Sequence, residues 1–356
     1  YPQSFEYSTI GGWVVTRSSG QQSLRYGRIE QMFHGGRLVT PQGEWRVGGV
    51  PATGAGIDMR DLVLGSEGRL GLLTEVSARV RPVPGHESFH AVFFADWASA
   101  FASIRGLAQS GLALSMLRLS NAVETDTQLR LAGKPGLIRW LRRYLAIRGV
   151  AEGACMLMVG ITGTEAEARR LRRDAGALVR SGGGIWLGTA IGKGWARKRF
   201  HGPYLRNALW DAGYAVDTVE TAVDWPRATD LMQAIETAAR DALSEHGEAV
   251  HAFTHLSHVY RQGCSIYSTF VFRAGVDPDA DLQHWRKLKT RVSEAIVAGG
   301  GTISHQHGVG VDHAPWLEAE KGAQGMALLR AMAAQIDPER MLNPGKLFAE
   351  AAPASR

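Results

Sequence analysis

Residues from about 85 to 300 repeat a strand–helix–strand order, and this order constrains the fold more than any other feature of the sequence. Short apolar runs bounded by turn residues predict strands, and longer runs with apolar residues at helical spacing predict helices. Thr164 precedes one such run and glycines 182–184 follow it, so we expect a helix over 165–180 with Thr164 as its N-cap. The other expected strands are 90–95, 112–119, 154–161, 250–260 and 265–273, and the other expected helices are 97–109, 226–245 and 281–298. Strands paired as hairpins with helices on one face predict an α+β sheet domain.

The rest of the chain divides into an N-terminal and a C-terminal stretch. Residues 1–84 are rich in glycine and short apolar runs, and the last run, 72–80, alternates polar and apolar residues as a strand does. We therefore expect this stretch to be β-rich and loop-rich. Residues 299–356 open on three glycines, include a helix expected over 323–336 and end in a small, polar tail, 349–356, that we expect to be frayed.

Composition is that of an ordinary globular protein with an excess of glycine. Apolar residues make up 45% of the chain, and no apolar run approaches the roughly 18 residues of a membrane span. Glycine accounts for 43 of 356 residues, and residues without a side chain let a ligand lie directly on the backbone. Cys155 and Cys264 lie far apart, which excludes a disulfide framework and favours a reducing, cytoplasmic location.

The net charge of +6 is unevenly distributed along the chain. Between Gln128 and Asn207 there are sixteen Lys and Arg residues against four Asp and Glu residues. This asymmetry favours an anionic partner, such as a phosphorylated substrate or a membrane surface; a basic surface without a partner is the alternative. Residues 139–148 mix arginines with large apolar side chains, which is typical of a peripheral membrane helix or of a helix with one face in the core. No nucleic-acid-binding motif is present, so we expect no nucleic acid partner.

Two glycine-containing segments are candidates for a backbone cradle. Residues 4–12 alternate hydroxyl and apolar side chains before a glycine pair, and residues 65–71 place three glycines directly before the expected strand 72–80. The second segment is not a dinucleotide fingerprint, because no helix follows it.

Together the two segments carry a resemblance to a known superfamily. SFEYSTIGGWVVTRSSG and GSEGRLGLLTEVSARVRP resemble the second half of the FAD-binding domain of the vanillyl-alcohol-oxidase (PCMH) type, and nearly the whole chain resembles the alkyldihydroxyacetonephosphate synthase family within it. Further matching pieces are YGRIEQM (26–32), LRLSN (117–121), GPYLRNAL (202–209), CSIY (264–267) and GGGTISHQHGVG (299–310).

The resemblance implies three regions. It implies the C-terminal half of an FAD-binding domain over 1–84, an α+β cap domain with an antiparallel sheet over 85–298, and a segment over 299–356 whose active-site loop returns toward the FAD domain. It also implies that the family's first FAD subdomain precedes Ser4 and is lacking from this sequence.

The resemblance also assigns site residues. FAD contacts are implied for Gln3, Ser4, Phe5, Glu6, Tyr7, Ser8, Thr9, Thr16, Arg17, Ser18, Ser19, Glu67, Gly68, Arg69, Leu70, Gly71, Leu72 and Leu73. Catalytic roles are implied for Tyr267, His305, His307 and Arg118, and substrate phosphate binding for Arg206. Gln306 stands where the family has the middle histidine of a triplet, and an amide does not titrate.

The strand 264–273 allows an independent test of Tyr267. Its even-numbered residues are the more apolar and form the expected core face, whereas Tyr267 shares the other face with hydroxyl side chains. A neighbouring His⁺ or Arg⁺ would lower the pKa of the phenol. We expect no metal, because His305 and His307 lack a third ligand nearby in the sequence. A site formed by His251, His255 and His258 is the alternative.

The leading interpretation is an FAD-dependent enzyme of ether lipid synthesis that exchanges the acyl group of acyl-dihydroxyacetone phosphate for a fatty alcohol. One alternative is an FAD-linked oxidase or dehydrogenase of D-2-hydroxy acids, although that branch has a Gly-Asp-Gly-Asn motif and a glutamate in place of Gln306. A second alternative is a non-catalytic fragment. The sequence leaves peripheral membrane contact and a homodimer open.

Overall fold

The structure is a computed structural model that describes residues 1–348, so the expected frayed tail, 349–356, lies outside the described residues. The chain forms two compact units, and each is described by itself. Unit 1 comprises Tyr1–Gly20, Gly27–Arg81 and the described part of Gly300–Arg356, and unit 2 comprises Gln21–Tyr26 and Pro82–Gly299. The domain boundaries expected near 84 and 299 stay a prediction.

Unit 1 is built on a three-stranded antiparallel sheet in the order β2-β1-β3. Its elements are η1 (Phe5–Tyr7), α1 (Ile10–Val15), α3 (Ile29–Met32), β1 (Phe33–Thr40), β2 (Gly43–Gly48), α4 (Met59–Val63), β3 (Leu72–Ala78), η2 (Ala314–Trp316) and α13 (Leu317–Ile336). Val14, Phe33 and Leu38 lie in its core. The strand expected over 72–80 is confirmed as β3. The helix expected from 323 is confirmed, and it begins earlier because α13 continues through a break at Gly322, whose φ is +70°.

Helix α1 was not expected from the sequence, because its glycine pair is typical of a loop. Thr9 caps the helix by accepting a hydrogen bond from the Gly12 N–H at 3.0 Å. A Cβ on Gly11 would lie 3.1 Å from the Leu73 carbonyl oxygen, so this glycine lets α1 approach β3 closely. Gly11 therefore serves helix packing in unit 1.

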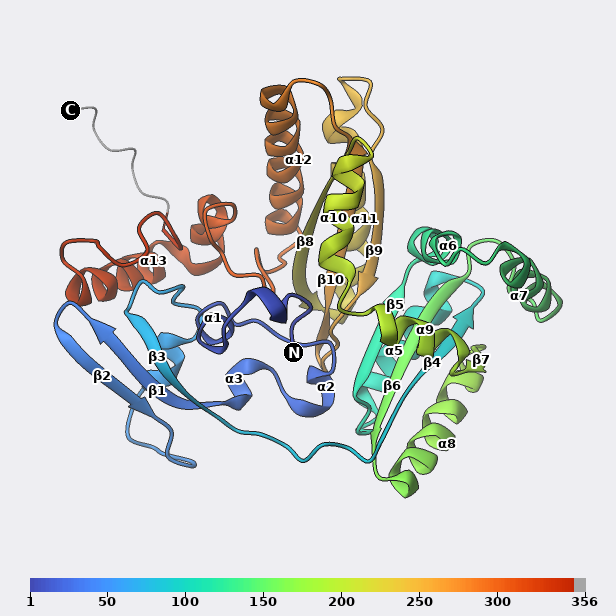
Figure 1. Cartoon of the computed structure of the whole chain (residues 1–356), viewed down its shortest axis with the longest axis horizontal. Helices are drawn as coiled ribbons and strands as arrows, with labels where there is room; N and C mark the ends of the chain where they lie inside the picture. Colours follow the sequence, from blue (N-terminus) through green and yellow to red (C-terminus); the bar gives the residue numbers. More distant parts are fainter. Residues whose placement is uncertain (349–356) are drawn as a thin grey trace. The chain divides into compact units, whose positions relative to one another are not determined.

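Unit 2 is built on a seven-stranded sheet in the order β7-β4-β6-β5-β9-β10-β8, in which all neighbours are antiparallel (Figure 1). The strands are β4 (His86–Phe94), β5 (Met116–Ser120), β6 (Cys155–Gly163), β7 (Ile185–Gly188), β8 (Tyr214–Asp224), β9 (His251–Leu256) and β10 (Gly263–Arg273). The α+β fold with an antiparallel sheet is confirmed. The strand expected over 250–260 is shorter than predicted and ends at Leu256.

The helices of unit 2 are α2 (Ser23–Tyr26), α5 (Trp97–Gln109), α6 (Ala122–Leu131), α7 (Pro135–Ile147), α8 (Glu165–Ser181), α9 (Ala190–Lys198), α10 (Gly202–Asp211), α11 (Trp225–Ser244) and α12 (Pro278–Ala298). Thr164 caps α8 as predicted, because its hydroxyl accepts from the Glu167 N–H and the Glu167 carboxylate accepts from the Thr164 N–H. Among the described residues, no helix has both the length and the apolar character that crossing a membrane requires.

One face of this sheet, here called the packed face, is buried beneath α5, α8, α11 and α12. Cys264, Ile266 and Phe270 of β10 point to it and are fully buried, so the expected core face is confirmed. Figure 1 shows α11 and α12 lying along strands β8–β10.

The opposite face, here called the split face, carries two kinds of side chain. Over β4 and β6 it is apolar, and Leu141 of α7 and Trp195 of α9 belong to one apolar cluster with Phe89 and Met158 there. The expectation that helices cover one face only is therefore wrong at this end of the sheet, where apolar side chains point both ways. Over β5, β9, β10 and β8 the split face carries ionisable and hydroxyl side chains among some apolar ones, and this half, here called the polar half, holds the candidate site.

Candidate functional site

A row of directly paired residues crosses the split face. Residues opposite each other in antiparallel strands point to the same side of a sheet. The row is Phe93 (β4), Met156 (β6), Ser120 (β5), His255 (β9), Tyr267 (β10) and Glu220 (β8). Its first two members belong to the apolar half and its last four to the polar half. The register thus brings side chains more than 140 residues apart in sequence into one line.

Tyr267 is half-buried in this row and lies against His255. The two rings are stacked, with centroids 4.7 Å apart and an angle of 18° between their planes. Burial raises the pKa of Tyr267 to about 12, and the hydrogen bond to Thr218 and the charge of Arg118 do not offset it. The expected lowering of this pKa is therefore wrong, because loss of solvent outweighs the neighbouring positive charge. At neutral pH the phenol keeps its proton and can act as a donor.

Arg118 lies two residues before Ser120 on β5 and points to the same split face. Its guanidinium donates to the Ser120 hydroxyl at 3.0 Å and to the carboxylate of Glu124 at 2.7 Å. Glu124 is almost fully buried, and burial alone would raise the pKa of its carboxyl. Arg118 and His255 outweigh the burial and lower the pKa of Glu124 to about 2. The structure therefore brings Arg118 and Tyr267 to one place, joined through Glu124 and His255.

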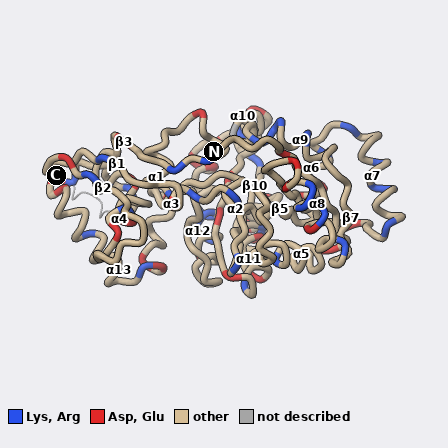
Figure 2. The backbone as a smooth tube through the Cα atoms, turned by 90° about the horizontal axis from the view of Figure 1, so that it is seen from below, with Lys and Arg blue, Asp and Glu red and all other residues tan. Residues whose placement is uncertain are grey.

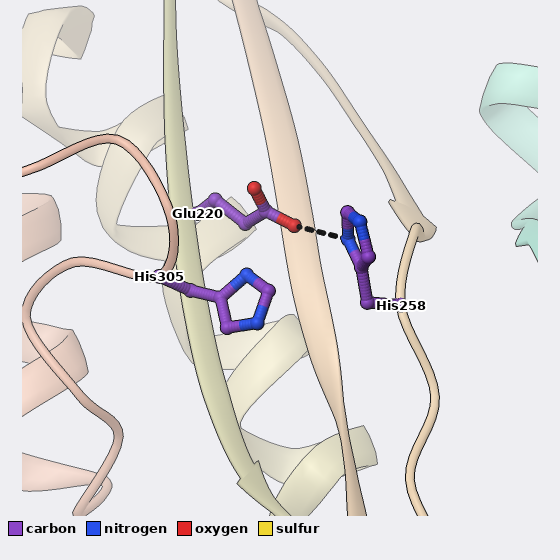
Figure 3. A group of neighbouring side chains, drawn as sticks. All are labelled: Glu220, His258 and His305. Atoms are coloured by element: carbon purple, nitrogen blue, oxygen red, sulfur yellow. Dashed lines mark hydrogen bonds and ion pairs between the residues drawn. The ribbon is translucent and has the colours of Figure 1, made fainter. Parts of the chain in front are cut away.

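A second polar group lies at the β8 end of the row. His258 Nδ1 is 3.4 Å from a carboxylate oxygen of Glu220, and both residues are buried (Figure 3). The Ser257 hydroxyl donates to the same Glu220 oxygen and lies 2.8 Å from the hydroxyl of Ser265. The sheet thus carries a hydrogen-bonded group of four polar residues beside Tyr267. The absence of a metal stays a prediction.

Arg206 does not join this cluster in the structure. It lies on α10, almost all of whose described side chains are exposed, and makes no hydrogen bond or ion pair with the described residues. Its assignment to substrate phosphate therefore stays a prediction.

In unit 1, two of the segments assigned to FAD lie side by side. The Glu67 N–H donates to the Val15 carbonyl at 2.9 Å, and Arg17 donates to the Leu64 carbonyl at 3.3 Å. Arg17 and Glu67 both adopt left-handed backbone conformations, with φ of +54° and +51°. The two hydrogen bonds hold residues 15–17 against residues 64–67.

The side chains of the 67–73 segment mostly stabilise the loop itself. The Glu67 carboxylate accepts from the N–H groups of Val309 and Gly310, and burial raises the pKa of Glu67 despite these bonds. Arg69 donates to the carbonyls of Leu342 and Asn343 at 2.9 and 3.2 Å. Gly68 and Gly71 have positive φ, Leu70 is buried, Leu73 is half-buried and Leu72 is exposed. Any FAD contacts here would therefore come chiefly from the backbone.

The histidine-containing loop returns to the same part of unit 1. His305 is buried, and its Nε2 lies 2.8 Å from a guanidinium nitrogen of Arg28. Arginine does not lose its proton, so Nε2 accepts and the other ring nitrogen of a neutral His305 carries the hydrogen. Gln306 adopts φ of +60° and accepts from the Ser19 N–H at 3.2 Å, whereas His307 is exposed.

The first FAD-assigned segment, Gln3–Thr9 in the sequence-based assignment, is largely exposed. It contains η1, with Phe5, Glu6 and Tyr7, and ends at the α1 cap Thr9. Ser8 accepts from the Trp13 indole at 2.7 Å and donates to the Ser4 carbonyl at 3.0 Å.

Sequence reasoning missed Glu124 and Glu220 of unit 2, and it missed Arg28 of unit 1. It considered His255 only as an alternative metal ligand. One signal for Glu124 was available, because Asn121 three residues earlier is a good N-cap residue and an acid at that spacing is typical of a helix start. The stacking of His255 on Tyr267 could not be found without the strand register.

Comparisons with known proteins show which family the chain matches. Residues 83–347 match the family described as "FAD linked oxidases, C-terminal domain", and residues 1–49 match "FAD binding domain". The chain is 32% identical to an alkyldihydroxyacetonephosphate synthase of Dictyostelium discoideum and 30% identical to one of Trypanosoma brucei brucei, each over 98% of this chain. It covers 58% and 57% of the length of those relatives. A solved alkyldihydroxyacetonephosphate synthase superposes with a TM-score of 0.77 at 29% identity, over 97% of this chain and 60% of the solved one.

Proposed function

The chain belongs to the family of FAD linked oxidases, C-terminal domain, and from this premise we propose that it serves an FAD-dependent exchange reaction. In this reaction the acyl group of acyl-dihydroxyacetone phosphate is replaced by a fatty alcohol. The bond from the substrate carbon to the acyl oxygen breaks, and a bond to the alcohol oxygen forms. The alcohol proton leaves with the released fatty acid, so there is no net oxidation. The observation that carries the proposal is the polar half of the split face, where Arg118 and Tyr267 meet at Glu124 and His255.

FAD is the cofactor of the matched families, and unit 1 offers one observation that fits it. Ser19 Oγ and Ser66 Oγ are buried and have no hydrogen-bond partner among residues 1–348. Buried polar groups nearly always have a partner, so a bound group at these segments would satisfy them. When bound, FAD would supply the reactive ring for the exchange, and the backbone of 16–19 and 67–73 would hold it.

The protein's own side chains would bind the substrate and move its protons. Arg118 would stabilise negative charge that develops on the substrate, and Arg206 would bind its phosphate. Tyr267 would donate from its phenol, because a pKa of about 12 keeps the group protonated at neutral pH. His305 and His307 are the further candidates for proton transfer.

The test is transfer of a labelled long-chain alcohol to palmitoyl-dihydroxyacetone phosphate by the purified protein with added FAD. We expect Tyr267→Phe to lower the rate at least about a hundredfold, since general acid catalysis contributes on that scale. The matched control is Tyr214→Phe, which removes an exposed hydroxyl at the start of β8. Bound FAD without any alcohol transfer, or an unaffected Tyr267→Phe variant, would contradict the proposal.

The family description names oxidases and so favours oxidation as a second candidate, for which we propose a D-2-hydroxy acid as the substrate. That reaction would reduce the flavin, whereas the exchange would leave it oxidised overall. Lasting loss of the flavin absorbance on anaerobic mixing with D-lactate would favour oxidation. An unchanged spectrum together with alcohol transfer would exclude it.

We also propose that α7 brings the protein to an anionic lipid surface. Leu137, Trp140, Tyr144 and Ile147 form a stripe along one side of the helix, and Trp140 and Ile147 are 64% and 77% exposed. This stripe is separate from Leu141 and Leu145, which are buried in the core. α7 contains no acidic residue, and Figure 2 shows Lys and Arg positions recurring along it. Large apolar side chains flanked by arginines are typical of helices that lie in a membrane interface.

Cosedimentation with phosphatidylserine-containing vesicles tests this contact. Arg142 forms an ion pair with Asp126, so the variant changes Arg139 and Arg143 to Glu instead. We expect most binding to be lost. The charge-matched control, Arg169→Glu with Arg170→Glu on α8, should bind as the unaltered protein does. Equal binding by both double variants would contradict the role of α7.

A further inference from the structure

We propose that Glu124 is a positioning residue of the polar half: its carboxylate fixes the guanidinium of Arg118 and the tautomer of His255, and His255 in turn holds the ring of Tyr267. The inference deepens the proposed function and rests on it, because that function assigns Arg118 and Tyr267 to the substrate. None of the family assignments above includes Glu124 or His255 in this role. The contacts that support it lie entirely within unit 2.

The carboxylate is held in place from its own backbone. Glu124 occupies the first turn of α6, and its N–H donates to the N-cap side chain of Asn121 at 2.9 Å. Asn121 is itself tied to β9 through the Thr254 carbonyl at 3.0 Å and to α11 through Glu236 at 2.7 Å. The start of a helix favours a negative charge. Glu124 is therefore an ionised group whose position is fixed by two neighbouring elements.

One oxygen of this carboxylate lies within hydrogen-bonding distance of three nitrogen atoms. Glu124 Oε1 lies 2.7 Å from a guanidinium nitrogen of Arg118, 3.0 Å from Nε2 of Gln128 and 3.0 Å from Nδ1 of His255. An ionised carboxylate can only accept hydrogen bonds, so each of these nitrogens must present a hydrogen to it. The orientation of Arg118 and of the His255 ring thus depends on the same atom.

This arrangement selects one tautomer of His255. Burial and the charge of Arg118 lower the pKa of His255, so the ring is neutral at pH 7 and carries a single N–H. If Nδ1 held the lone pair, it would face the carboxylate oxygen at 3.0 Å and be repelled. With the hydrogen on Nδ1, the lone pair lies on Nε2, on the side of the ring away from Glu124.

Arg118 makes the selection depend on the carboxylate charge. Its guanidinium nitrogen lies 3.1 Å from His255 Nδ1 as well as 2.7 Å from Glu124. Without the negative charge, a guanidinium N–H would donate to a lone pair on Nδ1, because a cation repels a second N–H. The hydrogen of His255 would then move to Nε2. Glu124 is therefore what keeps Arg118 and His255 as two donors side by side.

The ring that Glu124 orients is the one that lies flat on Tyr267. His255 and Tyr267 are paired in register on β9 and β10, and their rings are nearly parallel at 4.7 Å. Rotation of the imidazole would remove the surface against which the phenol is packed. A change of charge at Glu124 thus reaches Tyr267 without any direct contact between the two residues.

The tautomer can be measured by NMR of the full chain labelled with ¹⁵N-histidine at pH 7.5, with His255→Gln identifying the signal among the twelve histidines. We expect the Nδ1–H tautomer in the unaltered chain, and finding the Nε2–H tautomer would overturn the proposal. This first measurement needs no Glu124 variant, so it holds even if such a variant fails to fold.

The second measurement uses Glu124→Gln, which keeps the shape of the side chain and removes its charge. We expect the His255 signal to change to the Nε2–H tautomer. An unchanged tautomer would overturn the role of the charge. The matched control is Asp217→Asn, which neutralises a carboxylate on the packed face that accepts from Lys289 and Trp285, and it should leave His255 unchanged.

The two proposals fail separately, because the NMR measurement uses neither FAD nor substrate. A tautomer change in Glu124→Gln with no alcohol transfer by the unaltered protein would retain the positioning role and reject the exchange reaction. Alcohol transfer by the unaltered protein with an unchanged tautomer in Glu124→Gln would retain the exchange reaction and reject the positioning role.

Discussion

The two halves of the split face share one sheet and one register, yet they bury opposite kinds of side chain. Over β4 and β6 the face carries Phe89, Phe93 and Met158 beneath α7 and α9. Over β5, β9, β10 and β8 the same face carries ionisable groups, each with a hydrogen-bond or ring partner. An apolar surface is stabilised by packing alone, whereas a buried charge requires a specific partner. The comparison shows that the strand register fixes the position of each side chain, whereas its neighbouring groups determine whether a buried charge at that position is stable.

The largest effect should come from breaking an ion pair in the polar half. Arg118→Met leaves the Glu124 carboxylate buried without its main counter-charge, and we expect a loss of about 4 kcal/mol in unfolding free energy. Arg130→Met removes a partner of the exposed Asp126 and should cost under about 1 kcal/mol. Urea unfolding followed by tryptophan fluorescence measures both. Equal losses would contradict the prediction that the buried Arg118–Glu124 pair contributes more to stability than the exposed Arg130–Asp126 pair.

Acid should weaken the polar half in a defined pH range. The folded-state pKa of Glu124, about 2, lies below its ordinary value of 4.5. The ionised carboxylate therefore stabilises the fold in full at pH values above 4.5. This contribution, about 3 kcal/mol, is lost as the pH falls from 4.5 toward 2. The unfolding free energies of the unaltered protein and of Glu124→Gln should therefore converge over this range. Curves that stay parallel down to pH 2 would contradict the lowered pKa.

The stability of the apolar half should depend on side-chain volume and not on charge. A Cβ on Gly192 of α9 would lie 1.9 Å from the Phe89 carbonyl oxygen, so Gly192→Ala must push the helix off β4. We expect a loss of about 2 kcal/mol in unfolding free energy, which does not vary with pH. Gly194→Ala on the same helix meets nothing within 4 Å and should be neutral or slightly stabilising. A loss of stability in Gly192→Ala that varies with pH would contradict the prediction that the apolar half depends on side-chain volume and the polar half on charge.

The smallest effect concerns the packed face. Thr164→Ala removes the N-cap of α8 and should cost about 1 kcal/mol in thermal unfolding. Thr237→Ala, an exposed position within α11, serves as the control and should change little. A larger loss than that of Gly192→Ala would reverse the order predicted here.

Local signals explain which elements could be predicted from the sequence. The helix expected over 97–109 has the same bounds as α5, because Asp96 caps its start by accepting from the Ser99 N–H. Strand β8 escaped prediction because acids occur on both of its faces. Asp217 pairs with Lys289 on the packed face, and Glu220 lies on the split face. Distant segments of the chain contribute the partners of these acids, so an acid can lie on the packed face. The sequence of β8 therefore lacks the alternation of polar and apolar residues that predicts a strand.

The site was predictable only in part for a related reason. Tyr267 and Arg118 were singled out by resemblance, and their catalytic roles stay predictions. Glu124 and His255 were missed in this role because their contacts depend on β9 lying between β5 and β10, which no local pattern specifies. The pKa of Tyr267 was predicted in the wrong direction, since burial cannot be judged from neighbours in sequence alone.

The row across the split face has a consequence for how this protein can diverge. Side chains alternate along a strand, so the deletion of one residue within β9 would turn His255 toward the packed face and bring Thr254 or Leu256 to Tyr267. A point substitution alters one side chain, but a deletion would turn every residue of β9 beyond it to the other face of the sheet. Changes in chain length should therefore accumulate in the connections between strands, while β9 and β10 keep their lengths as their residues are exchanged one by one.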